Sequence, residues 1–169
     1  DSHGPVFYRQ VRVTTGNRDF RIFKFRTMIN NADKIGSLVT TGNDSRITRV
    51  GAKIRKCRLD EIPQLLNILK GEMSFVGTRP EVRKYVDRYT DEMMATLLMP
   101  AGVTSLASIS FKDEDELIDE YTEKGMSVDN AYMEKVLPEK MEYNLEYMNQ
   151  FGVFRDIKLM IQTFVSVIK

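Results

Sequence analysis

The centre of the chain reads LDEIPQLLNILKGEMSFVG over residues 59–77, and it predicts a helix followed by a short strand. Asp60 is a favourable N-cap residue, and Pro63 is tolerated in a first helical turn. Apolar residues then follow the i, i+3, i+4, i+7 spacing of an amphipathic helix, namely Ile62, Leu65, Leu66 and Leu69. Gly71 ends this predicted helix, 60–70, and a strand at 73–76 and a turn at 77–80 follow.

Two runs rich in β-branched and aromatic residues precede this stretch, at 6–14 and 20–26. The turn signal around Gly16 between them predicts a β-hairpin. Because side chains alternate along a strand, Phe23 and Phe25 share one face and Lys24 and Arg26 share the other. We expect the phenylalanines to face the core, which would present the two cations together on the opposite side.

The rest of the chain predicts helices at 81–98, 139–149 and 154–169, and an acidic helix or loop at 113–125. The helix at 154–169 has the strongest apolar stripe, so it is expected either to pack on the core or to lie on a membrane surface. The whole pattern predicts an α+β fold. We expect a single, mostly helical domain, 1–169, with a short N-terminal β-hairpin and surface amphipathic helices.

Charge is distributed unevenly along the 169 residues, although the total is close to neutral at +1. Residues 1–90 carry 18 basic and 9 acidic residues, and the remainder carries 7 and 15. Such a split indicates an anion-binding face in the first half. One cysteine, Cys57, excludes an internal disulfide framework, and a single histidine argues against a His/Cys zinc site. The sequence contains no apolar run long enough to span a bilayer.

The adjacent carboxylates Asp60 and Glu61 are the main candidates for chemistry. A helix start favours ionised carboxylates and also receives phosphate, and Mg²⁺ is held by one or two carboxylates together with substrate phosphates. Arg55 and Arg58 lie just before the pair and Arg79 follows it, and guanidinium groups suit phosphate recognition. Two alternatives remain open from the residues alone. The carboxylates could simply cap a helix, and the basic run 46–58 could be a solvated face or a lipid- or nucleic-acid-binding patch.

Five ordered blocks narrow these alternatives: GPVFYRQ at 4–10, KFRTM at 24–28, RITRVG at 46–51, LDEIPQL with its continuation at 59–77, and the tail around Tyr147 and residues 156–158. Together they resemble the bacterial sugar transferase family, the monotopic polyprenyl-phosphate phosphoglycosyl transferases. The resemblance covers nearly the whole chain.

The resemblance implies transfer of a phospho-sugar from a UDP-sugar donor to polyprenyl (undecaprenyl) phosphate, which yields a polyprenyl-diphosphate sugar and UMP. Asp60 would be the nucleophile, and Glu61 with Asp60 would hold Mg²⁺. The substrate phosphates would be bound by further residues, namely Lys24, Arg26, Arg55, Arg79 and Pro80. The implied setting is the cytoplasmic face of the bacterial inner membrane, at the first membrane step of surface glycan assembly.

Two departures accompany the resemblance. Thr78 stands where the family usually has proline, which predicts a looser turn, and residues 101–108 differ from the family pattern. The chain starts at the Gly-Pro block, so we expect that an N-terminal membrane helix has been removed. A catalytically silent scaffold that binds nucleotide sugars remains the alternative function. A nucleic-acid binder is disfavoured, because the basic run lacks a reading module and a set of stacking aromatic residues.

Overall fold

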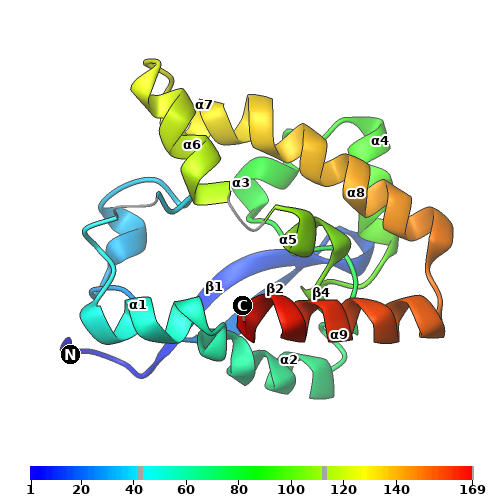
Figure 1. Cartoon of the computed structure of the whole chain (residues 1–169), viewed down its shortest axis with the longest axis horizontal. Coiled ribbons are helices and arrows are strands. Elements are labelled where there is room, and N and C mark those ends of the chain that lie inside the picture. The colour runs from blue at the N-terminus through cyan, green and yellow to red at the C-terminus, as the bar shows by residue number, and fades with distance from the viewer. Residues whose placement is uncertain (42–43, 112–113, 169) are drawn as a thin grey trace.

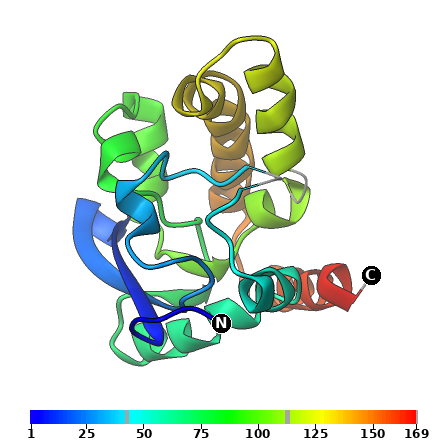
Figure 2. The same ribbon diagram turned by 90° about the vertical axis from the view of Figure 1, so that its left-hand side faces the viewer.

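The computed structural model describes residues 1–41, 44–111 and 114–168. It confirms the α+β fold with mostly helical structure and an N-terminal hairpin. The hairpin crosses the middle of the molecule, with α6, α7 and α8 on one side and α1, α2 and α9 on the other (Figure 1 and Figure 2). Asp113 and Lys169, the ends of two predicted helices, lie outside the described residues.

Strand β1 (Phe7–Thr14) pairs antiparallel with β2 (Arg18–Phe25) across the 3₁₀ turn η1 (Thr15–Asn17). Gly16 adopts a left-handed conformation with φ 68°, which glycine reaches without steric cost, so the predicted turn is confirmed.

The faces of β2 are the reverse of the prediction. Phe20 and Ile22 are buried against Met73, whereas Phe23 and Phe25 lie on the outer face, where both rings contact Phe7. The prediction that Phe23 and Phe25 face the core is therefore wrong. Lys24 continues the inward face of Phe20 and Ile22, and this places its ammonium group inside the molecule.

The chain after the hairpin forms η2 (Ala32–Lys34), α1 (Arg49–Lys56), η3 (Leu59–Gln64) and α2 (Leu65–Leu69). The predicted helix 60–70 is thus a 3₁₀ turn followed by a short α-helix. Asp60 is not its N-cap: Arg58 occupies that position with φ 51°, and Asp60 lies in the first turn. The polar residues of this segment face inward, and its apolar stripe faces outward, with Leu69 83% exposed.

Strands β3 (Ser74–Val76) and β4 (Gly102–Thr104) form a small parallel sheet. Thr78 extends it, because its N–H donates to Pro100 and its C=O accepts from Gly102. The turn is therefore held on both sides rather than loosened. A Cβ on Gly77 would lie 2.1 Å from the Pro100 carbonyl oxygen, so this close approach requires glycine.

The predicted helix 81–98 is broken into α3 (Arg83–Val86), α4 (Asp91–Met94) and the 3₁₀ turn η4 (Ala95–Leu98). Thr90 causes the break, because its side chain accepts from the Met93 N–H and starts a new helix. The remaining helices are α5 (Leu106–Ser110), α6 (Glu114–Glu123), α7 (Val128–Ala131), the π-helical turn η5 (Tyr132–Val136), α8 (Leu137–Gln150) and α9 (Val153–Ile168).

We call the part of the molecule with α6, α7 and α8 the upper layer and the part with α1, α2 and α9 the lower layer (Figure 1). The largest apolar core lies in the upper layer, where Ile118, Val136 and Leu137 pack together with Tyr85. Helix α9 contributes Leu159 to a smaller cluster around Val76. The rest of its apolar stripe is exposed and packs on no core, namely Phe154, Ile157, Met160, Ile161, Phe164 and Val165. Within the described chain, no helix combines the length and apolar character that crossing a bilayer requires.

Candidate active site

Turn η3 forms the floor of the site, because it directs polar side chains inward beneath the hairpin. Asp60 and Glu61 are each only 8% exposed, and Gln64 is also buried. Pro63 lies near the end of this turn, two residues before α2 begins, so it interrupts no hydrogen bond inside α2. The local fold therefore buries two adjacent carboxylates, an arrangement that needs compensating cations.

Glu61 is held by two cations from distant parts of the chain. Its Oε1 accepts from Lys24 Nζ at 2.8 Å and from Arg79 Nη2 at 3.3 Å. Burial by itself would raise the pKa of Glu61, but the charges of Lys24 and Arg79 outweigh it and hold that pKa well below its ordinary value. Burial in turn lowers the pKa of Lys24. Glu61 is thus an ionised anchor that draws Lys24 and Arg79 together.

Asp60 differs from its neighbour. In the described part of the chain, no other residue's side chain donates a hydrogen bond to its carboxylate. Burial raises the pKa of Asp60, the charge of Lys24 opposes that rise, and the charge of Glu61 adds to it. A desolvated carboxylate without a fixed partner is available for nucleophilic attack or for a cation.

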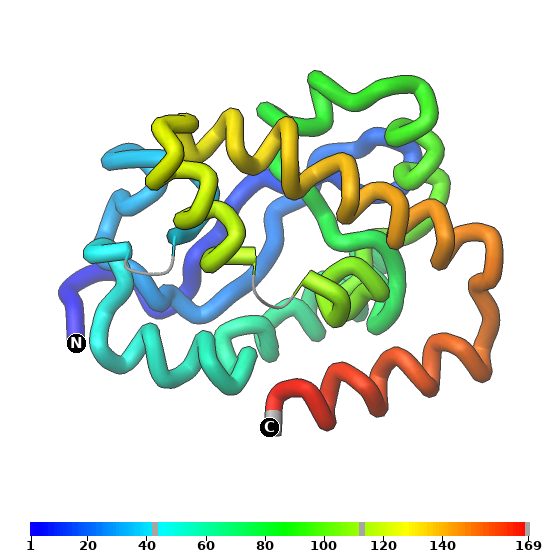
Figure 3. The backbone as a smooth tube through the Cα atoms, turned by 45° about the horizontal axis from the view of Figure 1, so that its top comes forward, coloured from blue at the N-terminus to red at the C-terminus, as the bar shows by residue number. Residues whose placement is uncertain are grey.

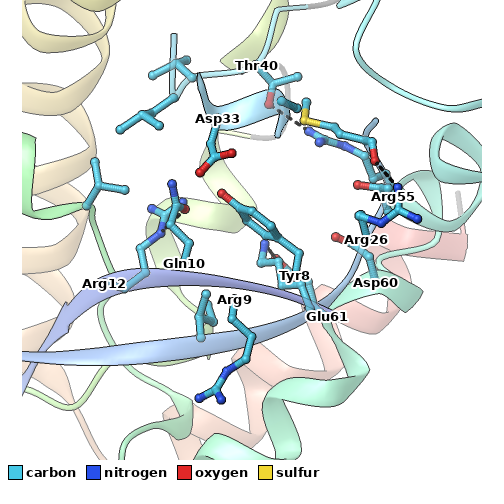
Figure 4. Close-up of a pocket in the computed structure, with 18 of the residues that line it drawn as sticks. Tyr8, Arg9, Gln10, Arg12, Arg26, Asp33, Thr40, Arg55, Asp60 and Glu61 are labelled. Atoms are coloured by element: carbon cyan, nitrogen blue, oxygen red, sulfur yellow. Dashed lines mark hydrogen bonds and ion pairs between the residues drawn. The ribbon is translucent and has the colours of Figure 1, made fainter. Parts of the chain in front are cut away.

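The two carboxylates line an open cavity of about 510 Å³, which falls within the usual range for small-molecule sites. Figure 4 shows Tyr8, Gln10 and Arg12 of β1 along one wall, with Asp60 near the other end. Arg9 points away from this cavity, as strand alternation requires, and its guanidinium lies over the Phe23 ring.

Most of the predicted phosphate-binding residues meet in this cavity, but their side chains are not equally available. Lys24, Arg55 and Arg79 line it near Asp60, and Arg55 donates to Thr40 Oγ1 at 3.1 Å. Arg26 also lines it, yet its guanidinium holds the N-terminal segment through Ser2, Pro5 and Met28. Pro80 lies in the cavity wall, where its carbonyl accepts from Arg12 at 3.1 Å.

The structure adds two residues that the sequence prediction did not assign to the site. Arg58 lines the cavity beside Arg79. Asn67 is fully buried and ties α2 to β2: its Oδ1 accepts from the Phe23 N–H and its Nδ2 donates to the Arg21 carbonyl. Asn67 could have been found from the helical spacing, because it falls between the apolar positions on the face of Asp60. For Arg58 the signal is its position two residues before Asp60, within the basic run 46–58.

The donor set fits magnesium better than a transition metal. Among the described residues, no three His, Cys, Asp or Glu side chains gather closely enough to form a metal cluster. Mg²⁺ does not need such a cluster, because it typically uses one or two carboxylates and completes its shell with water and substrate phosphate oxygens. Asp60 and Glu61 satisfy that requirement.

A buried carboxylate pair among arginines and a lysine, at the floor of a cavity of small-molecule size, is an arrangement suited to binding phosphate esters. The sequence model of the family described as bacterial sugar transferase matches residues 1–169. The chain belongs to this family.

Three curated relatives illustrate the likeness. The chain is 35% identical over 99% of its length to a UDP-N-acetylgalactosamine-undecaprenyl-phosphate N-acetylgalactosaminephosphotransferase of Aeromonas hydrophila. It is 32% identical over 99% of its length to a UDP-glucose:undecaprenyl-phosphate glucose-1-phosphate transferase of Xanthomonas campestris. It is also 32% identical over 97% of its length to an uncharacterized sugar transferase, EpsL, of Bacillus subtilis. The chain spans 36% and 32% of the first two relatives and 70% of the third.

Proposed function

We propose that this protein transfers a phospho-sugar from a UDP-sugar to polyprenyl phosphate and releases UMP. The observation that carries the proposal is the difference between the two carboxylates at the cavity floor. Glu61 forms ion pairs with two cations, whereas Asp60 forms none among the described residues. The names of the Aeromonas and Xanthomonas relatives, which are sugar-1-phosphate transferases acting on undecaprenyl phosphate, support the same reaction.

Asp60 acts as the nucleophile in the proposed mechanism. One of its carboxylate oxygens attacks the sugar-bearing phosphorus of the donor, so that an Asp–O–P bond forms while the P–O bond to UMP breaks. An oxygen of the polyprenyl phosphate then attacks the same phosphorus, forms the diphosphate and releases the Asp60 carboxylate. Covalent catalysis of this kind divides one difficult transfer between two anions into two easier ones.

Charge neutralisation is the main task of the surrounding residues. Phosphoryl transfer depends on positioning and on electrostatic stabilisation more than on proton transfer. Lys24, Arg55 and Arg79 line the cavity next to Asp60, so they would offset the charge on the two phosphates. Asp60 and Glu61 would hold Mg²⁺, which supplies further positive charge to the phosphate oxygens.

The exposed apolar face supports a position on the membrane surface. Helices α1, α2 and α9 lie on the same side of the molecule in the different views (Figure 1 and Figure 3). Leu66 and Leu69 of α2 and Phe154 and Phe164 of α9 are exposed there. An amphipathic helix with such an apolar stripe binds the boundary between lipid headgroups and acyl chains. The cavity would then open close to a lipid-borne acceptor.

The test measures UMP release by the protein in detergent or lipid, with Mg²⁺, polyprenyl phosphate and a panel of UDP-sugars. We expect UMP release with at least one sugar, and a phosphate-labelled protein intermediate when the acceptor is omitted. Asp60→Asn should abolish both, whereas Arg88→Ala, at an exposed arginine outside the cavity, should retain both. Donor binding without UMP release across the panel would instead favour a silent scaffold.

Vesicle sedimentation tests the membrane position separately. We expect the protein to sediment with anionic phospholipid vesicles, and Phe164→Glu to weaken that binding because it places a charge in the apolar face. Ile35→Glu is the matched control, since Ile35 is equally exposed but lies in the segment between η2 and α1. Equal binding by the two variants would contradict the proposed orientation.

A further inference from the structure

Arg58 is held in an unusual backbone conformation between α1 and η3. Its φ of 51° and ψ of 20° lie in the left-handed region that residues other than glycine rarely adopt. The side chain is half-buried, and its Nη2 donates to the Ser108 carbonyl at 3.2 Å. A strained residue with an anchored guanidinium at the edge of a reaction cavity points to a functional constraint.

A second, smaller cavity of about 140 Å³ lies against this guanidinium. Arg58 and Arg79 line both cavities, whereas Ser108 and Phe111 line the small one alone. The small cavity is below the size of a site for a whole nucleotide or a drug-sized molecule, so it suits a compact headgroup.

Among the described residues that line the small cavity, Arg58 is the cation that forms no salt bridge with a carboxylate. Arg79 pairs with Glu61, and Lys140 pairs with Glu114 at 3.1 Å. In the described part of the chain, no carboxylate lies within 4.0 Å of Arg58. Burial and repulsion by the nearby charge of Arg79 lower the pKa of Arg58, whereas the charges of Glu61 and Asp60 raise it. An anion bound between Arg58 and Arg79 would relieve that repulsion.

Two acidic residues, Glu114 and Asp115, also line the small cavity, but they leave room for an anion beside Arg58. Glu114 pairs with Lys140, which is itself buried, lies 3.6 Å from Glu81 Oε1 as well, and contacts the Tyr132 hydroxyl at 3.1 Å. Burial raises the pKa of Asp115 and so disfavours its charged form. Because Arg79 is paired with Glu61, Arg58 is the cation that is left for an anion where the small cavity adjoins the main one, among the residues that the structure describes.

We propose that the small cavity is a second phosphate subsite, which binds the terminal phosphate of a monoester mainly through Arg58. The inference rests on the proposed function, in which two phosphate monoesters take part: the polyprenyl phosphate that enters and the UMP that leaves. Both present the same doubly charged group, whereas the donor's diphosphate occupies the main cavity over Asp60.

The experiment titrates UMP and, separately, a short-chain isoprenyl phosphate onto the protein by calorimetry. Arg58→Gly removes the side chain but keeps a residue suited to φ 51°, so the fold is preserved. We expect it to raise the Kd of one of the two monoesters by about tenfold or more, because charge-assisted hydrogen bonds are lost. The monoester that is affected identifies the occupant. Arg58→Lys should restore part of the affinity, and Arg88→Ala should leave both Kd values unchanged.

Ser108→Val separates the small cavity from the main one, because Ser108 lines only the former. We expect it to weaken the same monoester as Arg58→Gly, with melting curves confirming that it is folded. If folded Ser108→Val binds normally while Arg58→Gly does not, Arg58 acts in the main cavity and the subsite is wrong. If Arg58→Gly binds both monoesters within about threefold of the unmodified protein, the subsite is also wrong.

Turnover distinguishes this inference from the proposed function. A protein that binds a monoester through Arg58 but releases no UMP from any donor would retain the subsite and overturn the proposed function. A protein that turns over normally, with unchanged acceptor KM and UMP inhibition in Arg58→Gly, would retain the function and overturn the subsite.

Discussion

Helices α2 and α8 bury opposite kinds of side chain. The upper layer around α8 has an ordinary apolar interior, in which Val136 and Leu137 are fully buried. In the lower layer, Asn67 of α2 is fully buried, while Leu66 and Leu69 on the same helix are exposed. The difference shows that the residues around Val136 and Leu137 bury their apolar surface within the chain, whereas η3 and α2 leave most of their apolar stripe exposed.

In the lower layer, η3 and α2 direct their polar side chains inward and their apolar side chains outward, and we call this the inverted layer. The inward face of η3 and α2 carries Asp60, Glu61 and Asn67, which are compensated by Lys24, Arg79 and backbone groups of β2. Its apolar residues are therefore left on the outside, where the proposed membrane surface would cover them. One short segment thus presents a polar face to the substrates and an apolar face to lipid.

Leucine truncations in the two layers test this comparison with the largest expected effect. Leu137→Ala should lower the free energy of unfolding by about 2–5 kcal/mol, because it leaves a cavity in a close-packed core. Leu69→Ala should change it by less than about 0.5 kcal/mol, since that side chain is already exposed. Urea unfolding of both variants measures the difference. A similar loss in the two variants would show that α2 is packed in solution as α8 is.

Asn67→Leu asks whether the inverted layer tolerates an apolar interior. The substitution removes the partners of the Phe23 N–H and the Arg21 carbonyl, which lie in β2. We expect it to lower the free energy of unfolding by about 1–3 kcal/mol despite the added apolar surface, because buried backbone groups lose their hydrogen bonds. Asn149→Leu, near the end of α8, is the control for the substitution itself. Unchanged or increased stability of Asn67→Leu would contradict a polar interior in this layer.

Lys24→Met removes one of the two cations that pair with Glu61, and its effect on the free energy of unfolding should depend on pH. The pKa of Glu61 in the folded protein lies well below its ordinary value of 4.5. Its ionised form therefore stabilises the folded state above that value, and the contribution is lost as pH falls below it. Without Lys24 the pKa of Glu61 should rise, so about 1–3 kcal/mol should be lost at neutral pH and less in acid.

The difference in the free energy of unfolding between the unmodified protein and Lys24→Met is measured by urea unfolding between about pH 7 and pH 3. Other carboxylates with lowered pKa values, such as Asp44 and Asp129, titrate in both proteins and cancel in the difference. The two stability curves should converge toward acid. Parallel curves would show that Lys24 does not set the ionisation of Glu61.

The sequence predicted the hairpin, the carboxylate pair and the last amphipathic helix, because each has a strong local pattern. It could not predict which face of β2 turns inward, because aromatic or aliphatic residues occupy both faces and only Met73 and the rest of the core decide between them. It also placed one helix over 81–98, although the Thr90 cap divides it. The pairing of Lys24 and Arg79 on Glu61 joins residues far apart in sequence, so no local pattern encodes it.

Arg58→Gly is expected to change the free energy of unfolding less than Leu137→Ala, Asn67→Leu or Lys24→Met does, and in the opposite direction. A residue other than glycine in the left-handed region costs about 1 kcal/mol, and glycine relieves that strain while adding entropy to the unfolded chain. The substitution also removes repulsion from Arg79 together with attraction to Glu61 and Asp60, and these two electrostatic effects oppose each other. We expect the free energy of unfolding to rise by about 0.5–1 kcal/mol, measured by urea unfolding without phosphate. Because the phosphate subsite is also lost, added UMP or isoprenyl phosphate should stabilise the variant less than the unmodified protein. A variant that is destabilised without ligand would mean that Arg58 stabilises the fold through its hydrogen bond to Ser108 and is not reserved for binding an anion.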